Sequence, residues 1–124
     1  MKLRIRGDSL RLRLSQAELA RLHETGEVCD RIGFGDRSLD YALVRTDIDA
    51  PRARFDGDRI EVALPNAVAQ VWTQTEQVGI EAEQALPTGR LRLLIEKDFK
   101  CLAPRPGEDD SDAFPNPDAG TGSC

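Results

Sequence analysis

Basic side chains that alternate with apolar ones near the N-terminus are the residues best suited to binding chemistry. In residues 2–6 and 10–14 a basic residue alternates with Leu or Ile. Because a strand sends successive side chains to opposite faces, both segments should turn their basic side chains to one side. Guanidinium groups bind carboxylates and phosphates through paired N–H donors. The predicted site for an anionic ligand or an acidic protein is an arginine-rich sheet face made of Arg4, Arg6, Arg11, Arg13, Arg90 and Arg92.

A simpler role for these arginines is cross-strand ion pairing. The acids that alternate onto the polar faces of their own strands are Glu61, Glu81, Glu83 and Glu96. No aromatic residue interleaves the arginines, so they offer no platform for stacked bases, and the sequence argues against nucleic acid as a partner. The leading hypothesis is a small non-enzymatic binding or interaction module, whose arginine face the acidic C-terminal segment could also cover.

A second hypothesis places a metal- or thiol-dependent site, or a small enzyme, at the C-terminal end of the chain. Its candidate ligands are Cys101, Asp109, Asp110, Asp112 and Cys124, with His23 and Cys29 as possible additions. The cysteines lack the short paired spacing of zinc sites, and the acidic run lacks the EF-hand order. The default expectation is a buried Cys29, a half-buried Cys101 and a free Cys124, with no cofactor.

Catalytic signatures are missing from the sequence. Gly33-Phe34-Gly35 stands alone, without the rest of a dinucleotide fingerprint, and is predicted to be a turn. No nucleophile elbow, phosphate-binding loop or zinc-protease motif occurs. An enzyme is therefore the weaker hypothesis, and a structural or assembly role is the third.

The elements that must position these residues are short strands and two helices. Gly7-Asp8 predicts a tight turn between the first two strands. The first helix should begin at Ser15, which has capping-box spacing to Glu18, and end at Gly26. Pro65-Asn66 should open the second helix with Asn66 as its cap. The predicted apolar stripe of that helix is Val68, Val71 and Trp72.

The order of elements repeats along the chain. Shifting the sequence by 50 residues without a gap places Gly7 on Gly57, Val28 on Val78 and Leu43 on Leu93. This periodicity predicts an internal duplication with halves at about 2–46 and 53–98. The fold class is α+β, with two ββαββ units forming a mixed or antiparallel sheet and two helices packed on one face.

Composition divides the chain of 124 residues into a folded body and an acidic tail. Residues 1–100 contain 16 Lys or Arg and 17 Asp or Glu, whereas residues 101–124 contain one Arg and five acids. We predict an α+β domain over 1–100 and a Pro/Gly-rich tail over 101–124. No apolar run reaches the roughly 20 residues that span a bilayer, and no signal peptide is evident. The expected location is the cytoplasm, without a membrane partner.

Several segments resemble a small bacterial family of unknown function. They are residues 3–7, 11–16, 77–81, 96–102 and 112–117, which include the Glu-Lys-Asp-Phe-Lys-Cys-Leu and Phe-Pro-Asn-Pro stretches. The resemblance spans most of the chain and implies that the tail belongs to the protein's own design. It implies no activity and no catalytic residues.

Overall fold

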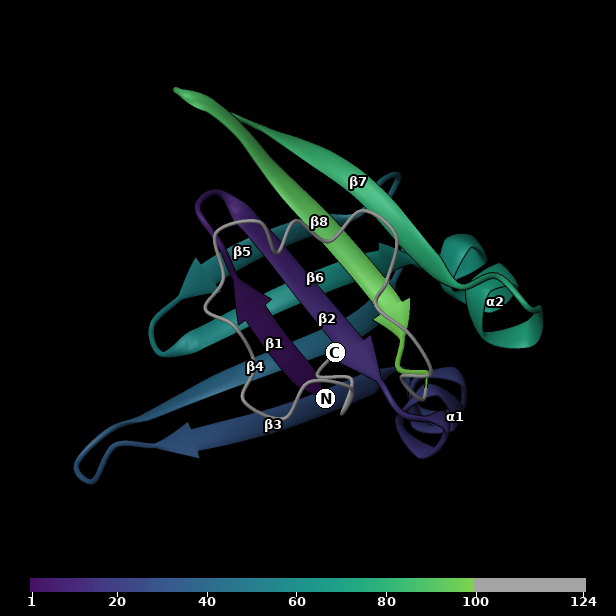
Figure 1. Cartoon of the computed structure of the whole chain (residues 1–124), viewed down its shortest axis with the longest axis horizontal. Helices are drawn as coiled ribbons and strands as arrows, with labels where there is room; N and C mark the ends of the chain where they lie inside the picture. The colour runs from purple at the N-terminus through teal and green to yellow at the C-terminus, as the bar shows by residue number, and fades with distance from the viewer. Residues whose placement is uncertain (100–124) are drawn as a thin grey trace, which may run out of the picture.

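The computed structural model describes residues 1–99, which form eight strands and two helices (Figure 1). The first unit consists of β1 (Lys2–Ile5), β2 (Ser9–Leu14), α1 (Gln16–Thr25), β3 (Glu27–Gly33) and β4 (Ser38–Thr46). The second unit consists of β5 (Arg52–Asp56), β6 (Arg59–Pro65), α2 (Asn66–Gln74), β7 (Gly79–Leu86) and β8 (Gly89–Lys97). The α+β class and the two ββαββ units are confirmed.

The strands divide into two mixed four-stranded sheets, where the sequence predicts one. Sheet A has the order β1-β2-β8-β7, and sheet B has the order β3-β4-β6-β5. Each sheet therefore takes one hairpin from each unit, joined by a parallel pair, β2 with β8 or β4 with β6. The two units interlock through this exchange, because neither can complete a sheet with its own strands.

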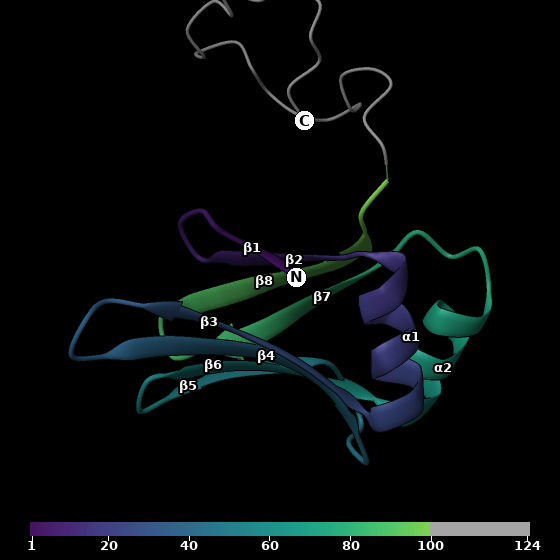
Figure 2. The ribbon, with the colours of Figure 1, turned by 90° about the horizontal axis from the view of Figure 1, so that it is seen from below.

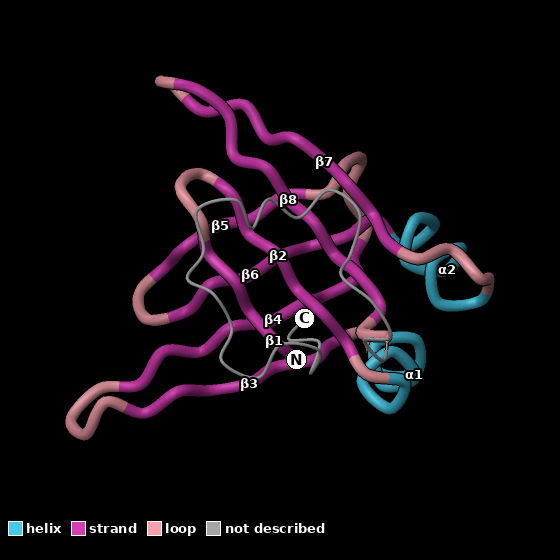
Figure 3. The backbone as a smooth tube through the Cα atoms, viewed as in Figure 1, coloured by secondary structure: helices cyan, strands magenta, loops and turns pink. Residues whose placement is uncertain are grey.

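Both helices lie at one end of the two facing sheets, and the hairpin turns lie toward the other end (Figures 2 and 3). Each helix carries the chain from one sheet to the other, α1 from β2 to β3 and α2 from β6 to β7. The expected packing of both helices on one sheet face is not confirmed. The turns at Gly7 and Gly57 have φ values of 52° and 57°, which glycine adopts without strain.

The core lies between the sheets and extends to the helices. The predicted core residue Trp72 is fully buried, as is Leu22 at the matching position of α1. Trp72 also donates from its indole Nε1 to the Val78 carbonyl at 3.2 Å. The prediction for Val71 is wrong, because 52% of this residue is exposed on the outer side of α2.

The two helices start and end differently. Ser15 and Glu18 form the predicted capping box of α1, and Gly26 ends that helix with a φ of 86°. The predicted Asn66 cap is wrong: Pro65 occupies the cap position without a side-chain bond, and Asn66 is the first helical residue. The Asn66 side chain instead accepts from Arg45 at 3.2 Å.

Strand register corrects the alignment of the two units. Leu12 pairs with Ile95 in sheet A, and Val62 pairs with Leu43 in sheet B. The offset is thus 50 residues in the first hairpin of each unit but 52 in the second. Gly26 leads α1 directly into β3, whereas α2 needs the longer connection through residues 75–78. A shift of two residues preserves the face of every side chain, so the patterns still match. Origin by duplication stays a prediction.

Candidate anion-binding face

The basic side chains of β1 and β2 lie together on the outer face of sheet A. In the antiparallel register Lys2 is opposite Arg13, and Arg4 is opposite Arg11. Like charges directly opposite each other destabilise a strand pair. Two such pairs side by side form a concentration of positive charge that β1 and β2 cannot neutralise from their own residues. We call Lys2, Arg4, Arg11 and Arg13 the basic hairpin face.

Glu96 of β8 is the acid nearest to this face. Its carboxylate accepts from Arg11 Nε at 2.5 Å and lies 4.0 Å from Arg13 Nε. The Arg13 side chain is only 11% exposed, yet its Nε and Nη2 have no hydrogen-bond partner within residues 1–99. Buried guanidinium donors are ordinarily paired, because leaving them unpaired costs free energy. Arg13 therefore has hydrogen-bonding capacity that residues 1–99 leave unused, at two nitrogens that solvent does not reach.

Lys2 has a partner at the end of β8. Its ammonium lies 2.8 Å from the Asp98 carboxylate, and this contact holds the pKa of Asp98 below its usual range. Asp98 therefore keeps its negative charge to a lower pH than an isolated Asp side chain does. The Lys2 side chain itself is 71% exposed, so solvent screens this ion pair.

The other predicted arginines have separate roles. Arg90 and Arg92 lie on β8 and pair with β7 acids, at 2.8 Å to Glu83 and 3.6 Å to Glu81. These contacts match the simpler hypothesis of cross-strand pairing. Arg6 is exposed at the β1–β2 turn, just beyond the basic hairpin face. Sheet A thus carries its unbalanced basic charge on β1 and β2, and acids on β7.

Glu61 does not contact the basic hairpin face, in contrast to the prediction. It lies on β6 in sheet B, where Arg59 and Arg54 approach it at 3.1 Å and 3.4 Å. The sequence could not distinguish the two sheets, because the polar positions of both sheets alternate in the same way. Only the strand pairing separates them.

The residues of the metal or thiol hypothesis that fall within residues 1–99 do not cluster. Cys29 is exposed on β3, in contrast to the buried position expected, and its sulfur lies 3.8 Å from Arg59 Nη1. His23 is exposed in the last turn of α1. Within residues 1–99 no three His, Cys, Asp or Glu residues are placed to hold a metal ion. The remaining candidates lie outside the described residues: Cys101, Asp109, Asp110, Asp112 and Cys124.

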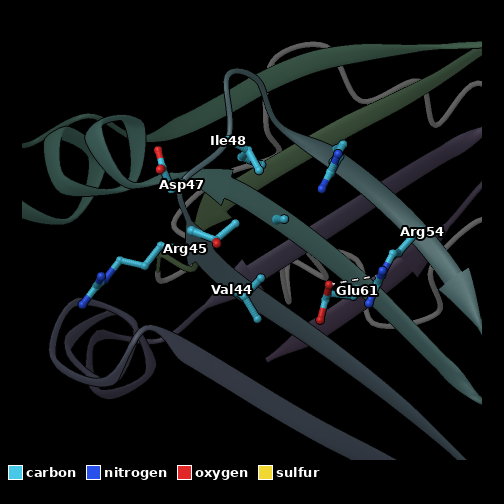
Figure 4. A pocket seen from close by; sticks show the side chains of 9 residues that line it. Val44, Arg45, Asp47, Ile48, Arg54 and Glu61 are labelled. Carbon is cyan, nitrogen blue, oxygen red and sulfur yellow. Dashed lines mark ion pairs between the residues drawn. The ribbon is translucent and has the colours of Figure 1, made fainter.

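A second group of basic residues, on β5, was not among the sites predicted from the sequence. Arg52 and Arg54 of β5 line a groove of about 490 Å³ on the outer face of sheet B (Figure 4). The signal was present, because Arg52-Ala53-Arg54 repeats the alternation of Lys2-Leu3-Arg4 after 50 residues. A single short alternation is a weak signal on its own, and β6, the strand beside β5, contributes one acid and no further base to this groove.

A family model described as the family of unknown function DUF7009 matches residues 1–118. The chain belongs to the DUF7009 family. The predicted membership of a family of unknown function is thereby confirmed. No curated protein and no solved structure matches the chain. None of the helices in residues 1–99 has the length and apolar character needed to cross a membrane.

Proposed function

We propose that this DUF7009 protein is a cytoplasmic, non-enzymatic binding module that takes an acidic peptide segment on its basic hairpin face. The observation that carries the proposal is the register of β1 and β2, which sets two basic pairs directly opposite each other. Maintaining such pairs costs stability, and an anionic partner would remove that cost. The Nε and Nη2 donors of Arg13 have no hydrogen-bond partner within residues 1–99, and they would bind a carboxylate once this largely buried side chain turns outward.

Two features favour a peptide carboxylate over a nucleic acid. The exposed aromatic residues Phe34, Phe55 and Phe99 lie in the β3–β4 turn, in β5 and after the end of β8, and none lies on β1 or β2 among the basic residues. Stacked bases therefore have no aromatic partner on this face. The four basic residues also follow two adjacent extended strands, a spacing that suits carboxylates along an extended peptide.

The acidic tail is proposed to compete for the same face. Its sequence holds Glu108, Asp109, Asp110 and Asp112, nine to thirteen residues after Phe99. An extended chain spans at most about 3.6 Å per residue, so nine residues reach roughly 30 Å. That reach exceeds the roughly 20 Å length of a six-residue strand such as β2. A linked segment also acts at a high effective concentration, so it would weaken binding of any external acidic peptide.

Binding of fluorescent poly-L-glutamate, followed by anisotropy at several salt concentrations, tests this function. We expect saturable binding that weakens as salt rises. Combining Arg4→Gln with Arg13→Gln should lower affinity by about tenfold or more, since each removes a charged donor. The matched control combines Arg90→Gln with Arg92→Gln, which should change affinity less than about twofold because Glu83 and Glu81 already pair with these arginines.

Binding that is absent, or that the control variant loses equally, would overturn the proposal. Thermal unfolding of each variant shows whether a lost affinity reflects a lost fold. Replacing Glu108, Asp109, Asp110 and Asp112 by their amides in the full chain tests the tail separately. Tighter binding of poly-L-glutamate supports competition, and unchanged binding removes the tail from the mechanism.

A further inference from the structure

The groove on sheet B is built by the exchange of hairpins between the two units. Since β6 lies between β4 and β5, the chain that connects β4 to β5 must pass the end of β6. Residues 47–51 make this connection, and Asp47 and Ile48 form one wall of the groove (Figure 4). The Ile48 N–H donates to the Thr46 carbonyl at 3.1 Å, which tightens the turn at the start of that wall.

Ala63 and Val44 make the floor of the groove. In the strand register they form one row with Arg52, which runs across β5, β6 and β4. The corresponding row of sheet A is Lys2, Arg13 and Glu96. Long charged side chains thus fill on sheet A the space that Ala63 and Val44 leave open on sheet B.

The arginines that line the groove differ in their availability. Arg45 turns its guanidinium to the end of α1, where it donates to the carbonyls of Leu22 and His23 at 3.1 Å and 2.9 Å. Arg54 pairs loosely with Glu61 at 3.4 Å. Arg52 is exposed and has no ion-pair partner within residues 1–99. One guanidinium is therefore fully available to a ligand, and a second is partly available.

The geometry points to a binding site for a small organic monocarboxylate in this groove. We infer that its carboxylate binds Arg52, with Arg54 beside it, and that a short aliphatic body lies over Val44, Ala63 and Ile48. The carboxylates of Glu61 and Asp47 also line the groove, and they repel any ligand that carries more than one negative charge. Since Asp47 lies at the end away from Arg54 (Figure 4), a second anionic group on the ligand would meet a carboxylate there.

Butyrate is the probe for this site, titrated into the ¹⁵N-labelled full chain and followed through backbone amide shifts. We expect saturable shifts confined to the amides that surround the groove, namely residues 44–54, 61 and 63, with a dissociation constant in the millimolar range, as suits a ligand of few atoms. Butylammonium and inorganic phosphate should not produce these shifts. Shifts with butylammonium in place of butyrate would overturn the assignment of a carboxylate.

Two variants test the location independently. Arg52→Gln removes the available guanidinium and should weaken butyrate binding by about tenfold or more. Ala63→Arg places on the groove floor the residue type found at the matching position of sheet A, and it should abolish binding. A well-dispersed amide spectrum shows that each variant is folded. If Ala63→Arg does not fold, Arg52→Gln alone tests whether butyrate binds in the groove.

Arg4→Gln is the matched control, because Arg4 takes the place on sheet A that Arg54 takes on sheet B. Butyrate affinity should not change in this variant. The inference is overturned if shifts do not saturate, if Arg52→Gln binds as well as the parent chain, or if Arg4→Gln abolishes the shifts. Poly-L-glutamate binding at sheet A is measured separately, so either proposal can fail without the other.

Discussion

The outer faces of sheets A and B share one backbone arrangement but differ in their chemistry. Both edge strands begin with two basic residues two positions apart, Lys2 and Arg4 in β1 and Arg52 and Arg54 in β5. Their neighbours differ, because Arg11 and Arg13 of β2 match Glu61 and Ala63 of β6. These two differences, together with Val44 of β4 in the place of Glu96 of β8, separate a crowded basic face from a groove that contains both basic and acidic residues.

The shared strand arrangement of the two sheets fixes where side chains lie, whereas the identity of single side chains sets the charge and shape of each outer face. In sheet B one arginine neutralises acids from two strands, because Arg59 bonds both Glu27 and Glu61, at 2.7 Å and 3.1 Å. These hydrogen bonds raise the pKa of Arg59 above its ordinary value. Sheet A keeps like charges opposite each other in β1 and β2, so its balance depends on β8 or on a partner.

The largest expected effect tests whether the two ββαββ units are structurally equivalent, and it comes from core residues at matching positions of α1 and α2. Trp72→Ala should lower the free energy of unfolding by about 3–5 kcal/mol, and Leu22→Ala by about 2–5 kcal/mol, because both side chains are fully buried at matching positions. Denaturant unfolding of each variant measures the change. Val71→Ala, next to Trp72 but half exposed, is the control and should change stability by less than about 1 kcal/mol. A large loss in only one of the two helices would refute their equivalence.

A smaller effect is expected at Gly79, which takes in sheet A the place of Glu27 in sheet B. A Cβ added at Gly79 would lie 2.9 Å from the Ile95 carbonyl oxygen, so the backbones of β7 and β8 must shift. Gly79→Ala should therefore destabilise the protein by about 1–3 kcal/mol in chemical denaturation. Glu27→Ala should cost less than about 1 kcal/mol, because it removes one exposed ion pair. Equal losses would argue against tighter packing in sheet A.

The basic residues at matching positions near the ends of β4 and β8 provide a third comparison. Arg45 donates to two carbonyls at the end of α1, and Lys97 donates to the Thr75 carbonyl at the end of α2 at 2.7 Å. Both satisfy carbonyls that the helix cannot pair internally. Arg45→Met should cost about 1–2 kcal/mol and Lys97→Met about 0.5–1 kcal/mol in thermal or denaturant unfolding. Arg37→Met, at the tip of the β3–β4 hairpin, is the exposed control, and the reverse order of losses would contradict the comparison.

The smallest expected effect concerns Glu18, whose match in the second unit is the apolar Val68. Burial alone would raise the pKa of Glu18, but hydrogen bonds from the Met1 amine and from Ser15 outweigh burial and lower it. A lowered pKa means that this stabilisation is present above the ordinary Glu value, about 4.3, and is lost as pH falls through the folded-state pKa.

Glu18→Gln should therefore be less stable than the parent chain near neutral pH by about 1 kcal/mol or less. The difference should vanish toward acidic pH, as measured by denaturant unfolding at a series of pH values. Glu24→Gln on the exposed side of the same helix should show no such trend. A difference that stayed constant with pH would contradict the assignment.

Much of the local structure could be predicted from the sequence, although the Asn66 cap and the burial of Val71 were not correct. Ser15, Glu18 and Gly26 specify the ends of α1, because capping bonds and a left-handed cap depend on residues a few positions apart. Alternation of charge and hydrophobicity specified the strands and the face that each side chain occupies, and Trp72 was correctly placed in the core. These signals arise from neighbours in the chain, so they survive without knowledge of pairing partners.

The pairing of the strands could not be predicted from the sequence and is known from the three-dimensional structure. Pairing of β2 with β8 and of β4 with β6 joins residues far apart in sequence, and a period of two is the same in either sheet. That choice placed Arg92 beside β2 on the outer face of sheet A, where it pairs with Glu81, moved Glu61 to sheet B and opened the groove beside Arg52. A binding surface depends on contacts between strands, and alternation within one strand does not encode its neighbour.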